Sequence, residues 1–266
     1  MLIHAKSIWL FLSRRAGFRL FLSRRLSNTG TVIMQFELLP PQLLAEFKSK
    51  KISTSTVIDI LDGLNAGNAL TPEIHAINMS EHYLVAQAYT VCWKMVRKGS
   101  NILQSQPSTW SQVSPFLVPE LQSGAGLVYV AGAGPLITDA ALAGGMSCTY
   151  FEQLGFAGVI LGGAVRDLRE LKLLAMPVLA SNPIPTDTQG AYWVAETGTQ
   201  CLIAQVRVQS GDLIVSDING TVVVPLMLAE RLLQQALAID STENAMLDQI
   251  RQGARLPELI NMTGRI

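Results

Sequence analysis

The chain has few of the residues from which metal sites, disulfide frameworks and charged interaction surfaces are built. Only 15% of its 266 residues are charged, and it holds three histidines and three cysteines. Cys92, Cys148 and Cys201 lie far apart, a spacing that supports neither a zinc knuckle nor a disulfide framework and fits a reducing compartment. We interpret each cysteine as a small buried apolar residue. The three histidines are too scattered for us to expect a site made of them.

The overall charge and the apolar runs exclude two further classes of partner. Twenty basic residues balance 20 acidic ones, so no basic field indicates nucleic acid and no acidic tail indicates disorder. The sequence contains no uninterrupted apolar run of membrane length, and we expect no membrane partner. Hydrophobic residues make up 49% of the chain, which is enough for a sizeable core. We therefore expect a globular protein in solution.

Charge is unevenly distributed along the chain. Residues 1–36 hold six basic residues and no acidic one, and they repeat the hexapeptide LFLSRR. This composition is typical of an organelle transit peptide, but a start codon assigned too far upstream explains it equally well. We expect residues 1–36 to lie outside the fold and residues 37–266, with 14 basic and 20 acidic residues, to form a single domain. We predict a cytoplasmic protein, or a mitochondrial one if the leader is a working transit peptide.

The first part of the domain predicts two helices and a strand. The stretch PPQLLAEFKSK begins with proline and is typical of a short helix. In ISTSTVIDILDGLN, apolar residues recur at helical spacing and Thr56 stands three residues before Asp59, so we expect a capped helix ending near Gly63. HYLVAQAYTVCW predicts a strand. Residues 98–124 are rich in Ser, Gln and Pro and predict a loop with at most one helix.

The rest of the domain predicts an α/β fold. GLVYVAG, GVILG and MPVLAS read as buried strands, with helices expected over 136–154 and 168–174 between them. The stretch from residue 200 to residue 225 predicts three strands, with turns at Gly211-Asp212 and Asn219-Gly220. Two helical segments then follow. We expect an α/β protein with a layered β/β/α domain, a mixed sheet and terminal helices that are free to pack on a neighbouring subunit.

Most catalytic motifs are absent or incomplete. AGAGPL at residues 131–136 lies where a dinucleotide-binding loop would stand, but the position of its third glycine is Ile137, so we interpret it as a plain strand-to-helix turn. The sequence contains no Gly-x-Ser-x-Gly elbow, phosphate loop or His-rich metal motif. Lys172 could form a Schiff base, although a solvated lysine on a helix face is the better interpretation.

Arg166 and Asp167 stand side by side where a predicted strand gives way to a helix, and two interpretations are open. Asp167 could cap that helix, with Glu170 three residues later completing a capping box, an arrangement worth about 1 kcal/mol. Alternatively, the pair lies at the carboxyl ends of parallel strands, where α/β sheets gather ligands. There a carboxylate can hold a divalent cation and an arginine can grip an anionic substrate.

Together, these motifs resemble the family of the regulator of ribonuclease E activity and the metal-dependent 4-hydroxy-4-methyl-2-oxoglutarate aldolases. The resemblance runs from about residue 54 to residue 228 through STSTVIDILDGL, GLVYVAG, GFAGVILGGAVRD and VQSGDLIVSDINGTVVVP. Its most specific feature is Gly-x-Val-Arg-Asp followed about 45 residues later by Gly-Asp-x-x-x-x-Asp-x-x-Gly-x-x-x-x-Pro. The resemblance implies a swivelling-type β/β/α fold and a homotrimer or dimer of trimers with sites at subunit boundaries.

The resemblance also implies an activity and a set of site residues. Asp167 would bind Mg²⁺ or Mn²⁺, and Arg166 would contact a pyruvate-like ligand and act in catalysis. The loop matching Gly144, Gly145, Met146 and Ser147 would hold the carboxylate of the ligand through backbone amides. The implied function is a metal-dependent lyase, either an aldolase or an oxaloacetate-type decarboxylase, acting on a small 2-oxo acid. A non-catalytic regulatory or binding protein on the same scaffold is the alternative.

The sequence departs from the family pattern around this site. Catalytic relatives usually carry an acidic residue 21 positions before the motif arginine, where this chain has Gly145. Many carry aspartate where it has Gly162, and a common Gly-Asp-Asn is replaced by Gly99-Ser100-Asn101. Each change removes negative charge or a water anchor near the expected cation. Asp139 could compensate, although an aspartate at a helix N-terminus is the ordinary interpretation.

Overall fold

The computed structural model describes residues 36–96 and 110–264, so residues 1–35 of the basic leader and Gly99-Ser100-Asn101 lie outside the described residues. Phe36, the last residue assigned to the leader, packs against the core. Its centre is a mixed sheet ordered β1-β7-β5-β3-β2-β11-β12, with β8 also paired to β2. β2, β3, β5 and β7 run parallel, and the other pairings are antiparallel. The strands are β1 (His75–Ala76), β2 (Leu84–Met95), β3 (Leu127–Gly132), β5 (Val159–Leu161), β7 (Val178–Ala180), β8 (Tyr192–Thr197), β11 (Leu213–Asp217) and β12 (Gly220–Val224).

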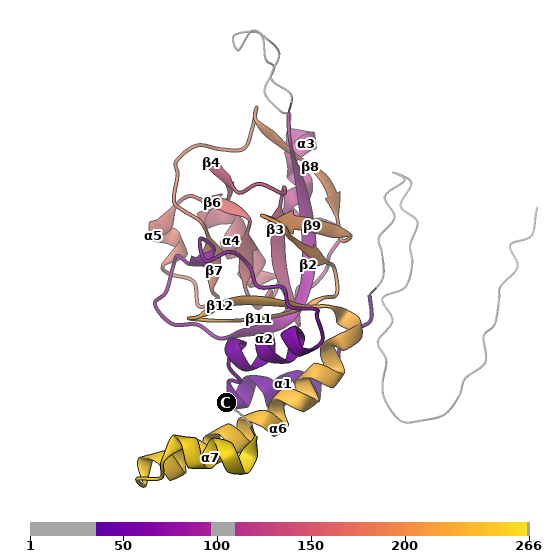
Figure 1. Cartoon of the computed structure of the whole chain (residues 1–266). Helices are drawn as coiled ribbons and strands as arrows, with labels where there is room; N and C mark the ends of the chain where they lie inside the picture. The colour runs from indigo at the N-terminus through magenta and orange to yellow at the C-terminus, as the bar shows by residue number, and fades with distance from the viewer. Residues whose placement is uncertain (1–35, 97–109, 265–266) are drawn as a thin grey trace, which may run out of the picture.

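Two smaller sheets and the helices surround this central sheet (Figure 1). One small sheet is the parallel pair of β4 (Ile137–Ala143) and β6 (Gly163–Val165), and the other is the antiparallel pair of β9 (Gln200–Ile203) and β10 (Val206–Gln209). The helices are α1 (Pro41–Lys50), α2 (Thr54–Gly63), α3 (Trp110–Val113), the 3₁₀ helix η2 (Ser114–Leu117), α4 (Gly145–Gln153), α5 (Leu168–Leu171), α6 (Leu226–Arg251) and α7 (Leu256–Thr263).

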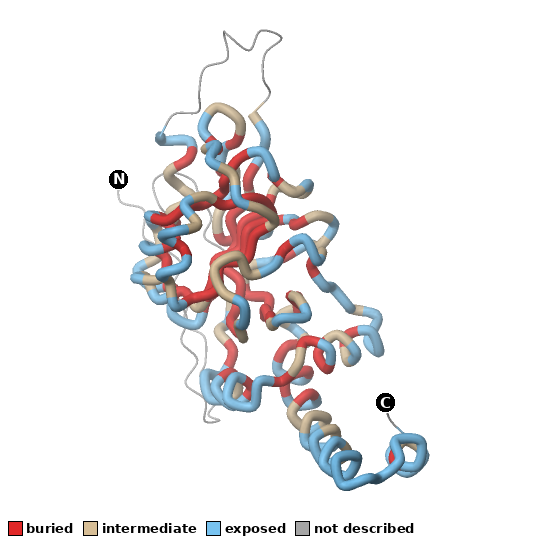
Figure 2. The backbone as a smooth tube through the Cα atoms, turned by 90° about the vertical axis from the view of Figure 1, so that its left-hand side faces the viewer, coloured by how far each residue is buried: buried red, intermediate tan, exposed pale blue. Residues whose placement is uncertain are grey.

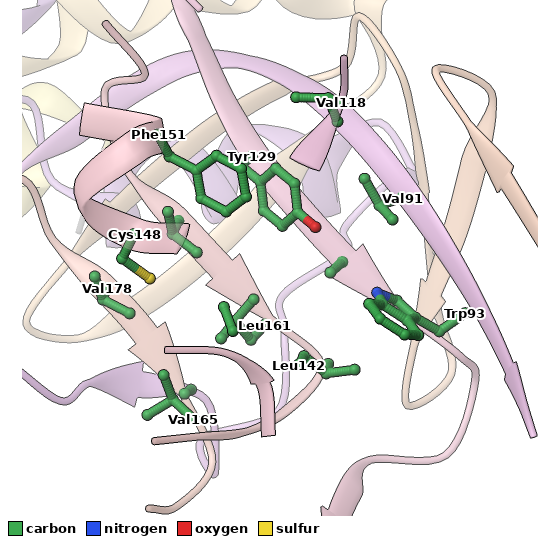
Figure 3. Close-up of a cluster of buried hydrophobic side chains, with 14 of the residues drawn as sticks. Val91, Trp93, Val118, Tyr129, Leu142, Cys148, Phe151, Leu161, Val165 and Val178 are labelled. Atoms are coloured by element: carbon green, nitrogen blue, oxygen red, sulfur yellow. The ribbon is translucent and has the colours of Figure 1, made fainter. Parts of the chain in front are cut away.

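The central sheet is buried on both faces, and this accounts for its continuous apolar strands. Along β3, Val128 and Val130 share one core cluster with Cys201 and Ile203 of β9. The alternate residue Tyr129 points to the opposite face, where its ring stacks on Phe151 of α4 with centroids 4.3 Å apart (Figure 3). Because successive side chains of a strand point to opposite faces, every residue of β3 meets an apolar layer. The result is the predicted β/β/α layering.

A separate core joins the remaining helices to the β11–β12 end of the sheet. Val215 of β11 packs in one cluster with Leu61 of α2 and Leu232 of α6. Beyond Ala236, no residue of α6 is buried, and its second half leads away from the body to α7 (Figures 1 and 2). None of the described helices combines the length and apolar character needed to cross a bilayer. That these terminal helices pack on a neighbouring subunit stays a prediction.

The helix expected over 136–154 is wrong in its first half, which is the strand β4. The alanine-rich sequence favours a helix, but pairing with β6 overrides this weak local preference, as Ala141 lies opposite Ala164 and Ala143 opposite Val165. The turn formed by AGAGPL therefore joins two strands, β3 and β4. Asp139 lies in β4, where it accepts a hydrogen bond from the Tyr192 hydroxyl at 2.8 Å, so the helix N-terminal interpretation of Asp139 is also wrong.

Three other expectations need smaller corrections. Residues 200–225 form four strands, because a turn at Ala204, in the left-handed conformation, divides the first expected strand into β9 and β10. The helix expected over 168–174 ends at Leu171. Helix α2 begins after Ser53, whose hydroxyl accepts a hydrogen bond from the Ser55 amide, so the cap is Ser53 rather than Thr56.

The second half of the family motif has a structural role. Asp212 accepts hydrogen bonds from the amides of Gln209 at 2.8 Å and Leu226 at 3.1 Å, which closes the turn before β11 and caps α6. Asp217 accepts hydrogen bonds from the amide of Thr54 at 3.0 Å and from its hydroxyl at 2.7 Å, and these bonds fix the start of α2. The two aspartates therefore hold helix N-termini against the sheet, outside the site described next.

Candidate active site

The ends of β4 and β6 place the candidate residues side by side. Ala143 lies opposite Val165 in this parallel pair, and the Arg166 amide donates to the Ala143 carbonyl at 3.1 Å. Consequently Gly144, which opens α4, and Arg166 emerge together at the carboxyl ends of the two strands. The sequence prediction located the pair correctly at the end of a parallel strand, although that strand belongs to the small β4–β6 sheet rather than to the central one.

Asp167 has an unusual backbone conformation that directs its side chain away from its own helix. Its φ of 63° and ψ of 47° lie in the left-handed region, which aspartate tolerates better than most residues. Its side chain makes no capping bond to α5, and Oδ2 accepts a hydrogen bond from the Gly145 amide at 3.0 Å. The capping-box interpretation with Glu170 is therefore wrong, because Asp167 caps the neighbouring helix α4.

Arg166 lies between two carboxylates. Its Nη1 is 2.9 Å from Oδ2 of Asp187, and its Nε is 3.7 Å from Oδ2 of Asp167. Asp187 is itself fixed, because its Oδ1 accepts a hydrogen bond from the Gln189 amide at 3.0 Å. Sequence reasoning missed Asp187, which follows Arg166 by about 20 residues in a polar loop and has no motif around it. The two carboxylates orient the guanidinium of Arg166 at the pocket. The side chains of Arg166, Asp167 and Asp187 all remain partly exposed there.

Tight packing around the first turn of α4 requires glycine at positions 144 and 145. A Cβ added to Gly144 would lie 2.5 Å from Oδ2 of Asp167, and one added to Gly145 would lie 2.7 Å from Cβ of Glu170. Ser147 closes the turn, with its hydroxyl 2.9 Å from the Gly144 amide and 3.0 Å from the Gly144 carbonyl. Since Gly145 already donates to Asp167, the Met146 and Ser147 amides are the first-turn groups left for an anion.

These residues open onto a pocket of about 560 Å³. Its polar part comes from the turns after β4 and β6 and from the loop around residue 187. An apolar wall comes from the end of β2 and from the α3–η2 segment. The lining residues are Trp93, Trp110, Val113, Phe116, Leu117, Pro119, Ala141, Leu142, Ala143, Gly144, Met146, Ser147, Tyr150, Arg166, Asp167, Asp187, Thr188 and Gln189. All the predicted site residues except Gly145 therefore line the pocket. Gly145 lies outside the lining, and its amide donates a hydrogen bond to Asp167.

The donor set at the pocket suits a loosely held hard cation. Within the described residues, no group of three or more His, Cys, Asp or Glu side chains could enclose a metal ion. Asp167 and Asp187 nevertheless contribute carboxylates, and no hydrogen bond among the described residues engages Oδ1 of Asp167. Mg²⁺ commonly binds through one or two carboxylates together with water and substrate oxygens. The residues present fit such an ion, and Asp167 would be its main protein ligand.

Two positions at which relatives are expected to carry an acidic residue, Gly145 and Gly162, are closely packed in this chain. The backbone at Gly145 faces the side chain of Glu170, and a Cβ at Gly162 would lie 3.0 Å from Ile203 Cγ1 and 3.1 Å from the Ala131 carbonyl oxygen. Asp139 does not line the pocket, so it does not compensate for them. The negative charge of the site therefore comes from Asp167 and from Asp187, which sequence reasoning had not considered.

Nearby groups that could take part in acid–base chemistry are few. Cys148 lies in α4 behind the first turn, and burial raises the pKa of its thiol to about 12, which makes it a poor nucleophile at neutral pH. Lys172 is exposed and lies outside the pocket lining, which favours the solvated interpretation over a Schiff base. No histidine lines the pocket in the part of the chain that the structure describes; the His82 ring nitrogen Nε2 contacts the Ser216 hydroxyl elsewhere.

Fold and site together define a mixed α/β protein with a ligand pocket at the ends of parallel strands. The chain belongs to the RraA-like family, described as Aldolase/RraA, whose model matches residues 54–223. A protein of Halalkalibacterium halodurans with the provisional name 4-hydroxy-4-methyl-2-oxoglutarate aldolase is 29% identical over 188 residues, which cover 70% of this chain and 79% of that protein.

Two further comparisons extend the range of relatives. An uncharacterized protein of Methanocaldococcus jannaschii is 30% identical over 124 residues; the match covers 47% of this chain and 59% of that protein. The crystal structure of Streptomyces coelicolor RraAS2, described as an unusual member of the RNase ES inhibitor RraA protein family, matches with a TM-score of 0.62 at 22% identity. That match covers 79% of this chain and 98% of the other. It confirms the expected fold.

Proposed function

We propose that the protein is a divalent-metal-dependent lyase that breaks a carbon–carbon bond of a small 2-oxo acid, as an aldolase or a decarboxylase. The observation that carries this proposal is the convergence of Arg166, Asp167 and the start of α4 on one pocket. A name shared by several relatives, 4-hydroxy-4-methyl-2-oxoglutarate aldolase, supports the same reaction class.

Each residue has a defined part in the proposed reaction. The carboxylate of the 2-oxo acid accepts hydrogen bonds from the Met146 and Ser147 amides, at the positive end of the α4 dipole. Arg166 directs its planar fork at the keto oxygen, where negative charge develops as the bond to C3 breaks. Asp167 holds Mg²⁺ or Mn²⁺, which when bound supplies Lewis-acid stabilisation of that charge. A water in the pocket carries the proton to C3, since no histidine lines the described part of the site.

Charge balance supports a cation in this pocket. Two carboxylates and one guanidinium leave the polar part with a net charge of about −1 before any ligand enters. A 2-oxo acid adds at least one further negative charge, and a divalent cation bound at Asp167 would neutralise most of the total. The proposed cation therefore makes the binding of an anionic substrate favourable in a site that would otherwise repel it.

Release of pyruvate tests the proposal. The full chain would be given oxaloacetate or 4-hydroxy-4-methyl-2-oxoglutarate with Mg²⁺ or Mn²⁺, and pyruvate would be followed with lactate dehydrogenase and NADH. We expect turnover that a chelator abolishes and that Asp167→Asn also abolishes, because the substitution removes the charged ligand of the proposed cation. Asp59→Asn, an exposed aspartate on α2, is the matched control and should retain full activity.

One observation favours the alternative, a regulatory or binding protein on the same scaffold. Arg166 is already paired with Asp187 and the Gly145 amide with Asp167, so two groups that could receive an anion are satisfied within the chain. The description of the Streptomyces coelicolor structure also places an RNase ES inhibitor family on this fold. If the pure, folded protein released no pyruvate with either metal from these two substrates or from an aryl-substituted 4-hydroxy-2-oxo acid, the lyase proposal would fail and this alternative would stand.

We also propose that the protein assembles as a homotrimer or a dimer of trimers, as the family resemblance implies. Met146 and Tyr150, which line the pocket, are 86% and 40% exposed and could be covered by a neighbouring subunit. Light scattering coupled to gel filtration would measure the mass of the assembly. A monomer at micromolar concentration would contradict this proposal.

A further inference from the structure

We propose that the preferred substrate is a 2-oxo acid with an aromatic or similarly bulky apolar group at its far end. This inference deepens the function proposed above and rests on it. Its basis is the apolar wall of the pocket, formed by Trp93, Trp110, Val113, Phe116, Leu117 and Pro119. A four-carbon oxo acid held by Arg166 and the start of α4 would leave this wall without a ligand contact.

The size of the pocket indicates a ligand larger than pyruvate or oxaloacetate. Its volume of about 560 Å³ lies in the range of about 300–1,000 Å³ that is typical of pockets for drug-sized molecules. The polar residues at the ends of β4 and β6 occupy one part of it. With a small oxo acid bound, the space beside the apolar wall would hold only water. Displacement of poorly ordered water by an apolar group of a larger ligand favours binding.

The apolar wall is a fixed feature of the fold. The rings of Trp93 and Phe116 lie with centroids 6.0 Å apart and tilted by 45°. The Tyr129 hydroxyl donates a hydrogen bond to the Phe116 carbonyl at 3.0 Å and so ties η2 to the central sheet. Trp93 is 1% exposed and belongs to the same core cluster as Leu142, which is drawn between it and Val165 in Figure 3. A wall fixed in this way can select a ligand by shape.

The charges around the pocket disfavour a second carboxylate at the far end of the substrate. The charged lining residues that the structure describes, Arg166, Asp167 and Asp187, lie together at the polar part, and Arg166 is the one cation among them. Among the described residues, a distal carboxylate would face aromatic and aliphatic side chains with no basic partner, and burial of an unpaired charge is unfavourable. An aromatic ring in the same place would instead contact the apolar side chains of Trp110 and Phe116.

The reaction expected of such a substrate balances without a further reactant. In 4-hydroxy-2-oxo-4-phenylbutanoate, the C3–C4 bond breaks as the C4 hydroxyl loses its proton and becomes the aldehyde oxygen. The electron pair of the broken bond passes to C3, giving the enolate of pyruvate, which takes up a proton at C3. The products are pyruvate and benzaldehyde, and nothing is oxidised or reduced by an outside agent.

Binding of non-cleavable acids tests the preference independently of turnover. Isothermal titration calorimetry of the full chain with Mg²⁺ would compare 4-phenyl-2-oxobutanoate with 2-oxoglutarate, which carries a distal carboxylate. We expect the phenyl compound to bind at least about tenfold more tightly, as expected for burial of an aromatic ring. 4-Phenylbutanoate keeps the carboxylate but lacks the keto oxygen, so it should bind more weakly than the phenyl oxo acid, because Arg166 and the proposed cation lose that oxygen as a partner.

A variant of the wall separates this preference from the general affinity for oxo acids. Trp110 is 60% exposed, so Trp110→Ala should leave the fold intact and lower the phenyl-to-glutarate affinity ratio about three- to tenfold. Met146→Ala, at an 86% exposed position of the lining, should act in the same direction. Trp193→Ala, at an exposed tryptophan of β8 outside the pocket, is the matched control and should leave the ratio unchanged. Melting curves would verify that each variant folds.

The outcomes distinguish this inference from the proposed function. If 2-oxoglutarate bound as tightly as the phenyl compound, or if Trp110→Ala and Met146→Ala left the ratio unchanged, the aromatic preference would be overturned and the lyase proposal would remain. If neither oxo acid bound, both proposals would be overturned. Cleavage of 4-hydroxy-2-oxo-4-phenylbutanoate with a higher kcat/KM than 4-hydroxy-4-methyl-2-oxoglutarate would support both.

Discussion

Asp167 has a structural role at the start of α4 and a separate chemical role in the proposed reaction. Its left-handed conformation turns the carboxylate to the Gly145 amide, and Oδ1 remains for a cation. Left-handed conformation costs most residues about 1–2 kcal/mol, and aspartate and asparagine bear it better than others. Any substitution of Asp167 therefore changes the fold and the chemistry together, unless the new residue also tolerates this conformation.

Asparagine and alanine at position 167 should separate these two roles. Asp167→Asn keeps an acceptor for the Gly145 amide and tolerates the left-handed backbone, so we expect a melting temperature close to that of the wild type. Asp167→Ala loses the cap and adds backbone strain, and should lose about 2 kcal/mol of unfolding free energy. Both should abolish metal-dependent pyruvate release. Equal melting temperatures for the two variants would contradict the capping geometry described here.

Asp187 offers a test of the pairing that sequence reasoning missed. Because Asp187 partly neutralises Arg166, Asp187→Asn should strengthen anion binding and lower the KM for the oxo acid by up to about fivefold, in line with about 0.2–1 kcal/mol for an exposed pair. The kcat should fall, since the guanidinium loses its fixed orientation. Steady-state kinetics at two salt concentrations would measure both effects. An unchanged KM would show that the pair does not restrain Arg166 in solution.

Helices and strands with a long apolar run or a clear start signal were predictable from the sequence. Those that form only by pairing with a distant segment were not. β2 and β3 are buried apolar runs, and α1 begins with a proline start signal. All three were predicted close to their observed positions. β4 was missed because its alanine-rich sequence favours a helix locally, whereas its strand partner lies about 20 residues further along the chain. The same applies within the site, where Arg166 and Asp167 were identified from their motif and Asp187 was not.

The two halves of the family motif should respond differently to mutation. Asp217→Ala removes hydrogen bonds to the Thr54 amide and hydroxyl and should lower the unfolding free energy by about 1–2 kcal/mol. Pyruvate release per folded molecule should remain unchanged, since Asp217 lies outside the pocket. Chemical denaturation and activity at a temperature well below the midpoint would measure both. A loss of activity in fully folded Asp217→Ala would place this residue in the site after all.

For the whole molecule, the layered core buries several groups that release protons at high pH. Burial raises the pKa of the Cys148 thiol from its ordinary value of 9.0 to about 12. The pKa of Tyr192 is raised to about 12, mainly by burial and further by its hydrogen bond to Asp139. Burial also raises the pKa values of Cys201, Tyr83, Tyr89 and Tyr129. The folded state therefore keeps protons that the unfolded chain loses.

This difference predicts alkaline destabilisation. The stability contributed by these groups is fully present below about pH 9, and it is lost as the pH rises from about 9 to about 12, since the unfolded state binds fewer protons in that range. Urea unfolding from pH 8 to pH 11 should show a falling unfolding free energy, and Cys148→Ala should flatten the fall. Rapid alkylation of Cys148 in the folded protein at pH 8 would contradict its raised pKa.

The contact between the Gly145 backbone and Glu170 limits how this chain could acquire the acidic residue that its catalytic relatives are expected to carry at position 145. Gly145→Asp alone would drive a new Cβ into the Glu170 side chain, 2.7 Å away, and place a second carboxylate next to the first. A protein engineer would therefore need a paired exchange, Gly145→Asp with Glu170→Gly. The single change at 145 should yield a poorly folded protein, whereas Glu170→Gly, at an exposed position, would first make the room that Gly145→Asp needs.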